Sequence, residues 1–242
     1  DIAAAAGVPA QRIYEIIRQT VLFRGLNPAQ VEQVLAAARL VACREGAFFF
    51  SEGDPARSSY ALVSGQVRLS QVSVEGQQVL MGYIGPGREF GIIAALGELA
   101  YPVSAQAVSE SQALVWDSQK LNELLDAIPA ITRNALFIMA RQIKEFQSRI
   151  RELSTQRVER RIARTLVRLA QQSGRQTAEG LQIELPVTRQ DLGEMSGTTL
   201  YTASRTLSQW EAQGLVICGR ERVVIRDLPA LAQFADDLPP RG

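Results

Sequence analysis

The spacing of apolar residues changes twice along this chain of 242 residues, and this change constrains its fold more than any other feature. Residues 13–40 have a helical spacing, and Pro28 suits the first turn of a second helix there. Residues 41–115 carry short or alternating apolar runs separated by glycines, with hairpin turns expected at residues 64–65 and 75–76. We therefore predict a helical lead-in followed by a small antiparallel barrel or roll.

A helical spacing returns after Pro129, where apolar residues recur at alternating steps of three and four. Charged residues such as Lys144 and Glu145 flank this narrow stripe. The pattern predicts a coiled-coil seam between two copies of the chain, whereas the alternative is a long amphipathic helix that packs on its own domain. The predicted seam consists of Leu136, Met139, Ile143, Phe146, Ile150 and Leu153. A second helix is expected over residues 158–172.

The segment "VTRQDLGEMSGTTLYTASRTLSQWEAQGLV", residues 187–216, contains two short helical patterns joined around Gly197. Thr188 is a suitable N-cap for the first helix, and Asp191 completes a capping-box-like start. Two short helices joined by a glycine turn are typical of a helix-turn-helix motif.

The second of these helices has two distinct faces. Ala203, Leu207 and Trp210 form an inward stripe, and Gly214 ends the helix. The opposite face carries Leu200, Tyr201, Ser204, Arg205 and Ser208. An exposed face that combines arginine, hydroxyl groups and an aromatic ring suits base edges and phosphates in a DNA major groove. The alternative is a structural helical hairpin with a solvated polar face.

The stretch "LVICGRERVVIRD" comes next and predicts two short strands around a basic turn, the wing of a winged helix-turn-helix. Arg220 and Arg222 lie in this turn, where arginines can contact DNA phosphate. The net charge of the chain is only +1, from 26 Lys and Arg against 25 Asp and Glu. Contact with DNA must therefore come from a local basic patch.

Composition excludes several classes of function. The chain has no histidine for catalysis or for binding zinc or haem. Two cysteines, Cys43 and Cys218, cannot supply four thiolates to an iron–sulfur cluster. We expect both side chains to be buried in the protein, and so few cysteines suit a reducing cytoplasm. Cys218, in the predicted wing, is also a candidate for oxidation near DNA. No nucleophile elbow, phosphate loop or metal-ligand spacing appears, so we predict no catalytic residue, no metal site and no enzyme activity. The chain also lacks an apolar run of about 18 residues and a signal peptide, which indicates a cytoplasmic protein without membrane contact.

The order of a roll, a long helix and a winged helix-turn-helix resembles the CRP/FNR superfamily of bacterial transcription regulators. The resemblance covers nearly the whole chain and rests on "MARQIKEFQSRI", "RRIARTLVRLAQQ", residues 185–216 and "GREFG". It implies an α+β fold with a sensory, cyclic-nucleotide-binding-like β-roll (jelly roll) at residues 1–127, a long dimerisation helix at 128–155 and a winged helix-turn-helix at 156–242. It also implies a homodimer that binds a palindromic operator in double-stranded DNA, with RNA polymerase as a further partner.

Residue by residue, the resemblance implies that Arg189 contacts phosphate and that Arg205 reads guanine. Thr199 and Thr202 match hydroxyl positions that contact the DNA backbone. Leu200 and Tyr201 stand at two further readout positions where many relatives have an arginine or a glutamate. The resemblance therefore does not determine the operator sequence. The predicted DNA-binding set is Thr188, Arg189, Thr199, Leu200, Tyr201, Thr202, Ser204, Arg205, Arg220 and Arg222.

The sensory site departs from the pattern of members that bind cyclic nucleotides. Ile92 stands where those members have a glutamate for the ribose, and Val103 stands where they have an arginine for the cyclic phosphate, although Ser104 is retained. Burying a phosphate without a cation costs on the order of several kcal/mol. We therefore expect a signal other than cyclic AMP, either an uncharged or aromatic small molecule or no ligand at all. The predicted effector pocket comprises Gly91, Ile92, Ile93, Val103, Ser104, Phe146 and Gln147.

Two functions are compatible with these features. One is a dimeric transcription regulator controlled by an unidentified effector and without a defined cofactor. The other is a cyclic-nucleotide-domain regulatory subunit of an enzyme or of another protein partner, which would share the roll but not the C-terminal motif. The intact motif at residues 187–216 favours the regulator.

Overall fold

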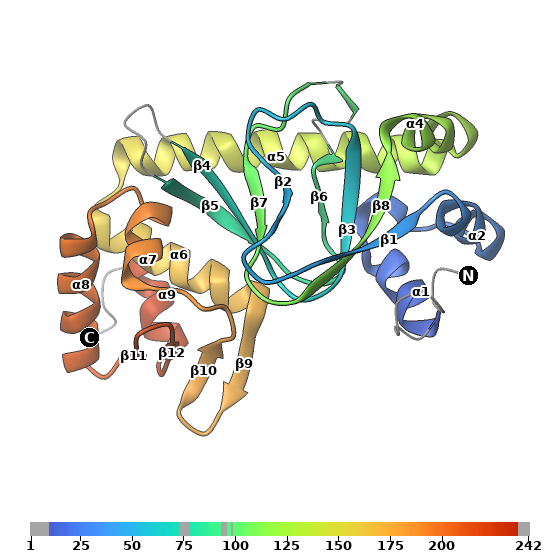
Figure 1. Ribbon diagram of the computed structural model, residues 1–242. Coiled ribbons are helices and arrows are strands. Elements are labelled where there is room, and N and C mark those ends of the chain that lie inside the picture. The colour runs from blue at the N-terminus through green and yellow to red at the C-terminus, as the bar shows by residue number, and fades with distance from the viewer. Residues whose placement is uncertain (1–9, 73–77, 93–95, 98, 237–242) are drawn as a thin grey trace. The chain divides into compact units, whose positions relative to one another are not determined.

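The computed structural model describes residues 10–72, 78–92, 96–97 and 99–236. Two compact units form, and they divide inside helix α5 (Pro129–Thr155), between Lys144 and Glu145. Figure 1 traces the elements of both units along the chain. Within the described ranges, no helix is long and apolar enough to cross a bilayer.

The N-terminal unit begins with helix α1 (Ala10–Gln19), the short 3-10 helix η1 (Val21–Phe23) and helix α2 (Pro28–Ala36). Asn27 caps α2, because its Oδ1 accepts a hydrogen bond from the Gln30 amide at 2.9 Å and Gln30 Oε1 accepts one from the Asn27 amide at 3.0 Å. The predicted helical lead-in, with a proline in the first turn of its second α-helix, is confirmed.

Two four-stranded antiparallel sheets form the roll, with the strand orders β1-β8-β3-β6 and β2-β7-β4-β5. The strands of the first sheet are β1 (Arg39–Cys43), β8 (Ser111–Asp117), β3 (Ser58–Ser64) and β6 (Glu89–Phe90). Those of the second sheet are β2 (Phe48–Phe50), β7 (Ser104–Ala107), β4 (Val67–Val72) and β5 (Gln78–Ile84). The predicted α+β fold with an N-terminal β-roll is confirmed.

The turn at residues 64–65 differs from the prediction. It joins β3 to β4, which lie in different sheets, so the hairpin predicted there is wrong. Gly65 has a φ of +85°, and a Cβ atom on it would lie 2.2 Å from Ser111 Oγ. A glycine turn signal in the sequence indicates the local backbone conformation and not the partner of the next strand. A hairpin turn and a turn that crosses to another sheet therefore look alike in the sequence. Strands β4 and β5 do pair, but the second predicted hairpin turn, at residues 75–76, lies outside the described residues.

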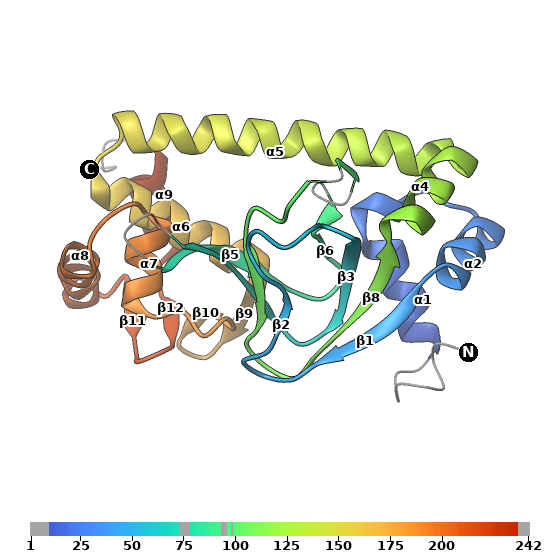
Figure 2. The ribbon, with the colours of Figure 1, turned by 45° about the horizontal axis from the view of Figure 1, so that its top comes forward.

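The first core of this unit lies between helices and the first sheet. Helices α1, α2, α4 (Ser118–Ala127) and the start of α5 bury apolar side chains there, and Figures 1 and 2 show α1, α2 and α4 gathered beside β1, β3 and β8. Trp116 is 1% exposed, and its Nε1–H donates to the Val34 carbonyl at 2.9 Å. The indole therefore ties β8 to α2 through both its surface and its one polar group.

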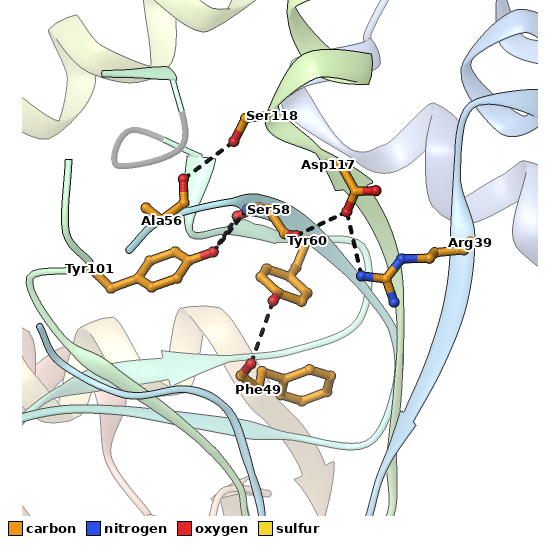
Figure 3. A network of polar contacts seen from close by, with 8 residues as sticks. All are labelled: Arg39, Phe49, Ala56, Ser58, Tyr60, Tyr101, Asp117 and Ser118. Carbon is orange, nitrogen blue, oxygen red and sulfur yellow. Dashed lines mark hydrogen bonds and ion pairs between the residues drawn. The ribbon is translucent and has the colours of Figure 1, made fainter. Parts of the chain in front are cut away.

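The second core lies between the two sheets and is aromatic. Phe50 stacks on Tyr101 with ring centroids 3.7 Å apart, and Tyr60 stacks on Phe90 at 4.9 Å. The Tyr101 hydroxyl donates to the Ser58 carbonyl at 2.6 Å and accepts from the Ser58 amide at 3.1 Å (Figure 3). Burial is the main cause that raises the pKa of both phenols. These rings pack together between the two sheets, and the hydroxyl groups of Tyr60 and Tyr101 have hydrogen-bonding partners there.

The C-terminal unit contains the end of α5, helix α6 (Val158–Ser173) and a sheet of order β11-β12-β10-β9. Its strands are β9 (Gly174–Thr177), β10 (Gly180–Ile183), β11 (Val216–Cys218) and β12 (Val223–Ile225). Its other helices are α7 (Arg189–Met195), α8 (Leu200–Ala212) and α9 (Leu228–Asp236). The predicted second helix, helix-turn-helix and wing strands are confirmed. The apolar spacing does not predict the β9–β10 hairpin, because β9 lacks apolar side chains.

We predict that Gly65→Ala lowers the free energy of unfolding by about 3 kcal/mol, because its Cβ would combine strain at positive φ with overlap of the Ser111 side chain. Gly53→Ala is the matched control, since Gly53 has a φ of +84° but no atom within 4 Å of an added Cβ. The control should lose only about 1 kcal/mol. Urea unfolding of both variants measures the difference, and equal losses would contradict the close approach at Gly65.

Candidate nucleic-acid interface

Helix α7 starts at a complete capping box. Thr188 Oγ1 accepts from the Asp191 amide at 3.1 Å, and Asp191 Oδ2 accepts from the Thr188 amide and hydroxyl at 2.9 and 2.8 Å. Two amides that the first turn would otherwise leave unpaired are thereby satisfied. The predicted cap is confirmed, and the Thr188 hydroxyl is engaged within it.

A glycine turn leads from α7 to α8. Gly197 has a φ of +62°, and Thr199 caps α8 by accepting from the Thr202 amide at 3.2 Å. Thr199 is exposed and Thr202 is half-buried, with their hydroxyl oxygens 3.0 Å apart. Both hydroxyls stand at the N-terminal end of α8, where the helix dipole favours an anion such as a phosphate.

The inward face of α8 is apolar, as its spacing predicts. Ala203, Leu207 and Trp210 are at most 2% exposed, and the Trp210 ring lies 5.6 Å from that of Phe234 on α9. Helix α7 lies beside α8 in Figure 1, and its Leu192 side chain is fully buried. Burial of this face fixes which side of α8 points outward.

The outward face of α8 is chemically mixed. Tyr201 is 75% exposed and Leu200 is 48% exposed in the first turn. Arg205 lies one turn further on and is also exposed, while Ser204 beside it is half-buried. Within the described part of the chain, Arg205 has no hydrogen-bonding or ionic partner. A free guanidinium next to an aromatic and an aliphatic side chain can meet both the acceptors and the methyl groups of base edges.

Arg189, at the start of α7, is bound to α8. Its Nη2 donates to Glu211 Oε2 at 2.9 Å, while Nη1 donates to Ser208 Oγ at 3.1 Å and to the Ser204 carbonyl at 3.4 Å. Glu211 Oε1 accepts the Cys218 amide at 2.8 Å. One carboxylate therefore connects the first helix, the second helix and the first wing strand. Sequence spacing gives no signal for this contact, because its members lie on separate elements.

The two arginines predicted in the wing have different surroundings. Strands β11 and β12 pair antiparallel, and the Gly219 amide donates to the Arg222 carbonyl at 2.7 Å. The Arg222 side chain forms an ion pair with Glu179 and donates to Gln182 Oε1 at 3.3 Å. Arg220 is exposed, and no described residue pairs with its side chain. Of the two, Arg220 is therefore the one whose charge is uncompensated.

Two of the residues predicted for the effector pocket, Gly91 and Ile92, belong to two different cores of the roll. A Cβ on Gly91 would lie 3.2 Å from Tyr101 and 3.3 Å from Phe50, so Gly91 is pressed against the aromatic core. Ile92 is buried in the core between the helices and the first sheet. Ile93 lies outside the described residues.

The remaining pocket residues are divided between the two units. Val103 packs against the aromatic core, and Ser104 Oγ accepts a hydrogen bond from the Glu52 amide at 2.9 Å. Phe146 and Gln147 are exposed and belong to the C-terminal unit. The structure thus brings Gly91 and Val103 to one core, and the pocket as a whole stays a prediction.

Helix α5 exposes apolar side chains at the predicted seam positions. Five of them are between 49% and 66% exposed, and Met139 is half-buried. The exposed five are Leu136, Ile143, Phe146, Ile150 and Leu153. Phe137, which the heptad spacing does not include, is also 55% exposed. Exposed apolar side chains at this spacing agree with the predicted seam, which stays a prediction.

Two protein families match the chain: cyclic nucleotide-binding domains at residues 40–127 and Crp-like helix-turn-helix domains at residues 160–234. The chain is similar to the cyclic AMP receptor protein of Thermus thermophilus, with 28% identity over 214 residues, which cover 88% of this chain and 96% of that protein. It is also similar to a CRP-like cAMP-activated global transcriptional regulator of Mycobacterium tuberculosis, with 24% identity over 221 residues, or 91% and 99% of the two chains. FixK2 from Bradyrhizobium japonicum shares the fold, with a TM-score of 0.71 and 23% identity over 81% of this chain and 96% of that one.

We predict that Cys218 reacts slowly with iodoacetamide at pH 8, about 100-fold more slowly than in the unfolded chain. Burial, followed by the nearby Glu211 carboxylate, raises the pKa of this thiol to about 11, although Arg189 opposes the shift. Because only the thiolate reacts, the rate should rise about tenfold per pH unit up to that pKa. Mass spectrometry of the Cys218 peptide measures the rate, and fast labelling of folded protein at neutral pH would contradict the prediction.

Proposed function

This chain belongs to the CRP/FNR superfamily of transcription regulators, and we propose that it acts as a homodimer that binds a palindromic operator under the control of a small molecule. Its helix-turn-helix domain makes it a DNA-binding regulator and not an enzyme. The observation that carries the proposal is the outward face of α8, where Arg205 is free and Tyr201 is exposed.

In the proposed complex, α8 enters the major groove. The guanidinium fork of Arg205 suits the paired acceptors of guanine, while Leu200 suits a thymine methyl group and the Tyr201 hydroxyl a polar base edge. Thr199 and Thr202 at the start of α8, with Arg220 in the wing, are the proposed phosphate contacts. The other members of the predicted set are hydrogen-bonded inside the protein, Ser204 through its backbone carbonyl, and would contact DNA through their remaining polar atoms. They are Thr188, Arg189, Ser204 and Arg222.

The proposed dimer forms along α5. Its exposed apolar stripe follows the coiled-coil spacing, and a second copy of the same helix offers a matching stripe. Two α8 helices related by the dimer axis would then address half-sites about one helical turn apart. This two-fold arrangement is what links the seam to a palindromic operator.

The proposed effector is an uncharged or aromatic molecule and not cyclic AMP. A cyclic nucleotide-binding domain implies a small-molecule effector, and both Crp-like relatives described above are named for cyclic AMP. In this chain, Ile92 is buried among apolar side chains and Val103 packs against aromatic rings. Neither side chain can pair with a phosphate, so a cyclic phosphate that entered the pocket would lose its water of hydration without gaining a cation.

RNA polymerase is the proposed further partner of the DNA-bound dimer, and the cytoplasm is the proposed compartment. A regulatory subunit of an enzyme is not favoured, because the match to Crp-like helix-turn-helix domains spans residues 160–234.

Arg205→Ala is expected to reduce discrimination between operator and unrelated DNA by about 5- to 150-fold, because a bidentate guanine contact contributes about 1–3 kcal/mol of discrimination. Arg220→Ala is the matched control for a phosphate contact. It should weaken binding to both duplexes alike and reduce the slope of log K against log salt by about 0.9. Titration of both variants against the duplex that wild-type protein selects from a random pool measures the two effects. Identical behaviour of the two variants would show that the role assignment is wrong.

Ile143→Glu is expected to weaken the dimer by on the order of 100-fold, because two carboxylates would be buried opposite each other in the seam. Lys144→Glu changes the charge of the neighbouring, flanking residue and should leave the dimer nearly intact. Sedimentation velocity at a series of concentrations measures the association. A fully dimeric Ile143→Glu variant would contradict the seam on α5.

A further inference from the structure

Three successive carbonyl groups at the α7–α8 turn accept hydrogen bonds from arginines on other helices. Arg149 of α5 donates its Nη2–H to the Met195 carbonyl. Arg161 of α6 donates Nε–H to the Ser196 carbonyl at 2.8 Å and Nη2–H to the Gly197 carbonyl at 3.0 Å. All five residues belong to the C-terminal unit.

These carbonyls stand where a helix leaves its acceptors unsatisfied. Helix α7 ends at Met195, and amides of residues 196–198 donate to the carbonyls of Leu192, Gly193 and Glu194. The carbonyl of Met195 and the two that follow it are left for side-chain donors, close to the negative end of the helix dipole. A guanidinium suits such a position, because its planar N–H groups can donate to several carbonyls and its positive charge interacts favourably with the negative end of the helix dipole. Arg161 also donates Nη1–H to the Gln156 carbonyl at 2.8 Å, and Gln156 follows the end of α5.

Apolar and hydroxyl contacts reinforce this attachment. A Cβ atom on Gly197 would lie 2.4 Å from Leu153 Cδ2, so α5 packs directly on the turn. The Ser196 hydroxyl is buried and donates to Thr165 Oγ1 of α6 at 3.1 Å. Arg149 is half-buried, and burial, followed by the charge of Arg168, lowers its pKa. Four side chains from α5 and α6 therefore hold one turn.

We propose that Arg149 and Arg161 are positioning residues for DNA recognition. Arg149 fastens the turn that sets the direction of α8 to the second half of α5, and Arg161 fastens it to the first turn of α6. Leu153 of the α5 stripe touches the same turn, so a displacement of the seam during a response to the effector reaches α8 through these contacts. This inference rests on the proposed function, because it assigns the attachment to the reading of an operator.

The test compares Arg161→Gln and Arg161→Lys with the matched control Arg160→Gln. Arg160 is the neighbouring residue of α6, and its Nε–H donates to a carbonyl of α9, that of Ala235, at 3.0 Å. The first readout is the ratio of affinities for the duplex that wild-type protein selects from a random pool and for an unrelated duplex. The second readout needs no DNA: it is amide hydrogen exchange across residues 196–203.

Arg161→Gln is expected to lower the affinity ratio by about tenfold or more and to speed exchange at the turn. Arg161→Lys should show smaller changes in both readouts, because its ammonium group keeps the positive charge but cannot reach all the carbonyls that the guanidinium fork reaches. Arg160→Gln should stay within about twofold of wild type in both readouts. Arg161→Lys decides the matter if Arg161→Gln does not fold. Unchanged exchange in the Arg161 variants, or faster exchange with an unchanged affinity ratio, would overturn the positioning role. Failure of wild-type protein to select any duplex would instead overturn the proposed function, while the exchange readout would still decide whether Arg161 holds the turn.

Discussion

Burial of one face of α8 is the constraint on which the rest of the C-terminal unit depends. Ala203, Leu207 and Trp210 leave this helix one way to pack, so the side that carries Tyr201 and Arg205 must point outward. The capping box of α7 and the Thr199 cap fix where both helices begin, and the glycine turn sets the angle between them. The chemistry of the outward face is therefore a consequence of apolar packing on the opposite face.

The distribution of arginines explains how a chain of net charge +1 can bind DNA. Several arginines of α6 donate hydrogen bonds to carbonyl groups inside the unit: Arg161 at the α7–α8 turn, and Arg160 and Arg164 at the Ala235 carbonyl. Their guanidinium groups are therefore directed at acceptors of the protein itself and are engaged there. The uncompensated guanidinium of Arg205 then forms a small local patch, which is what sequence-selective contact requires.

The sequence could predict features that depend on the spacing of residues along one helix or strand. It could not predict strand partners or side-chain contacts between separate elements. Steps of three and four identify the buried face of α8, and the first-turn proline of α2 and the threonine cap of α7 are recognisable because they act within one turn. By contrast, Gly65 looked like a hairpin turn, since nothing local reveals that the next strand joins another sheet. Contacts of Arg161 with Ser196, or of Arg189 with Glu211, join residues 35 and 22 positions apart on different helices. No periodic pattern records such contacts, so only the folded structure shows them.

Methylation interference on the duplex selected by the protein tests most directly the central claim that two symmetry-related α8 helices each read one half-site. The expected result is interference at guanine N7 in two symmetry-related positions separated by about one helical turn of DNA, with both signals lost in Arg205→Ala. Interference at a single position, or a pattern unchanged by removing the Arg205 guanidinium, would contradict the claim.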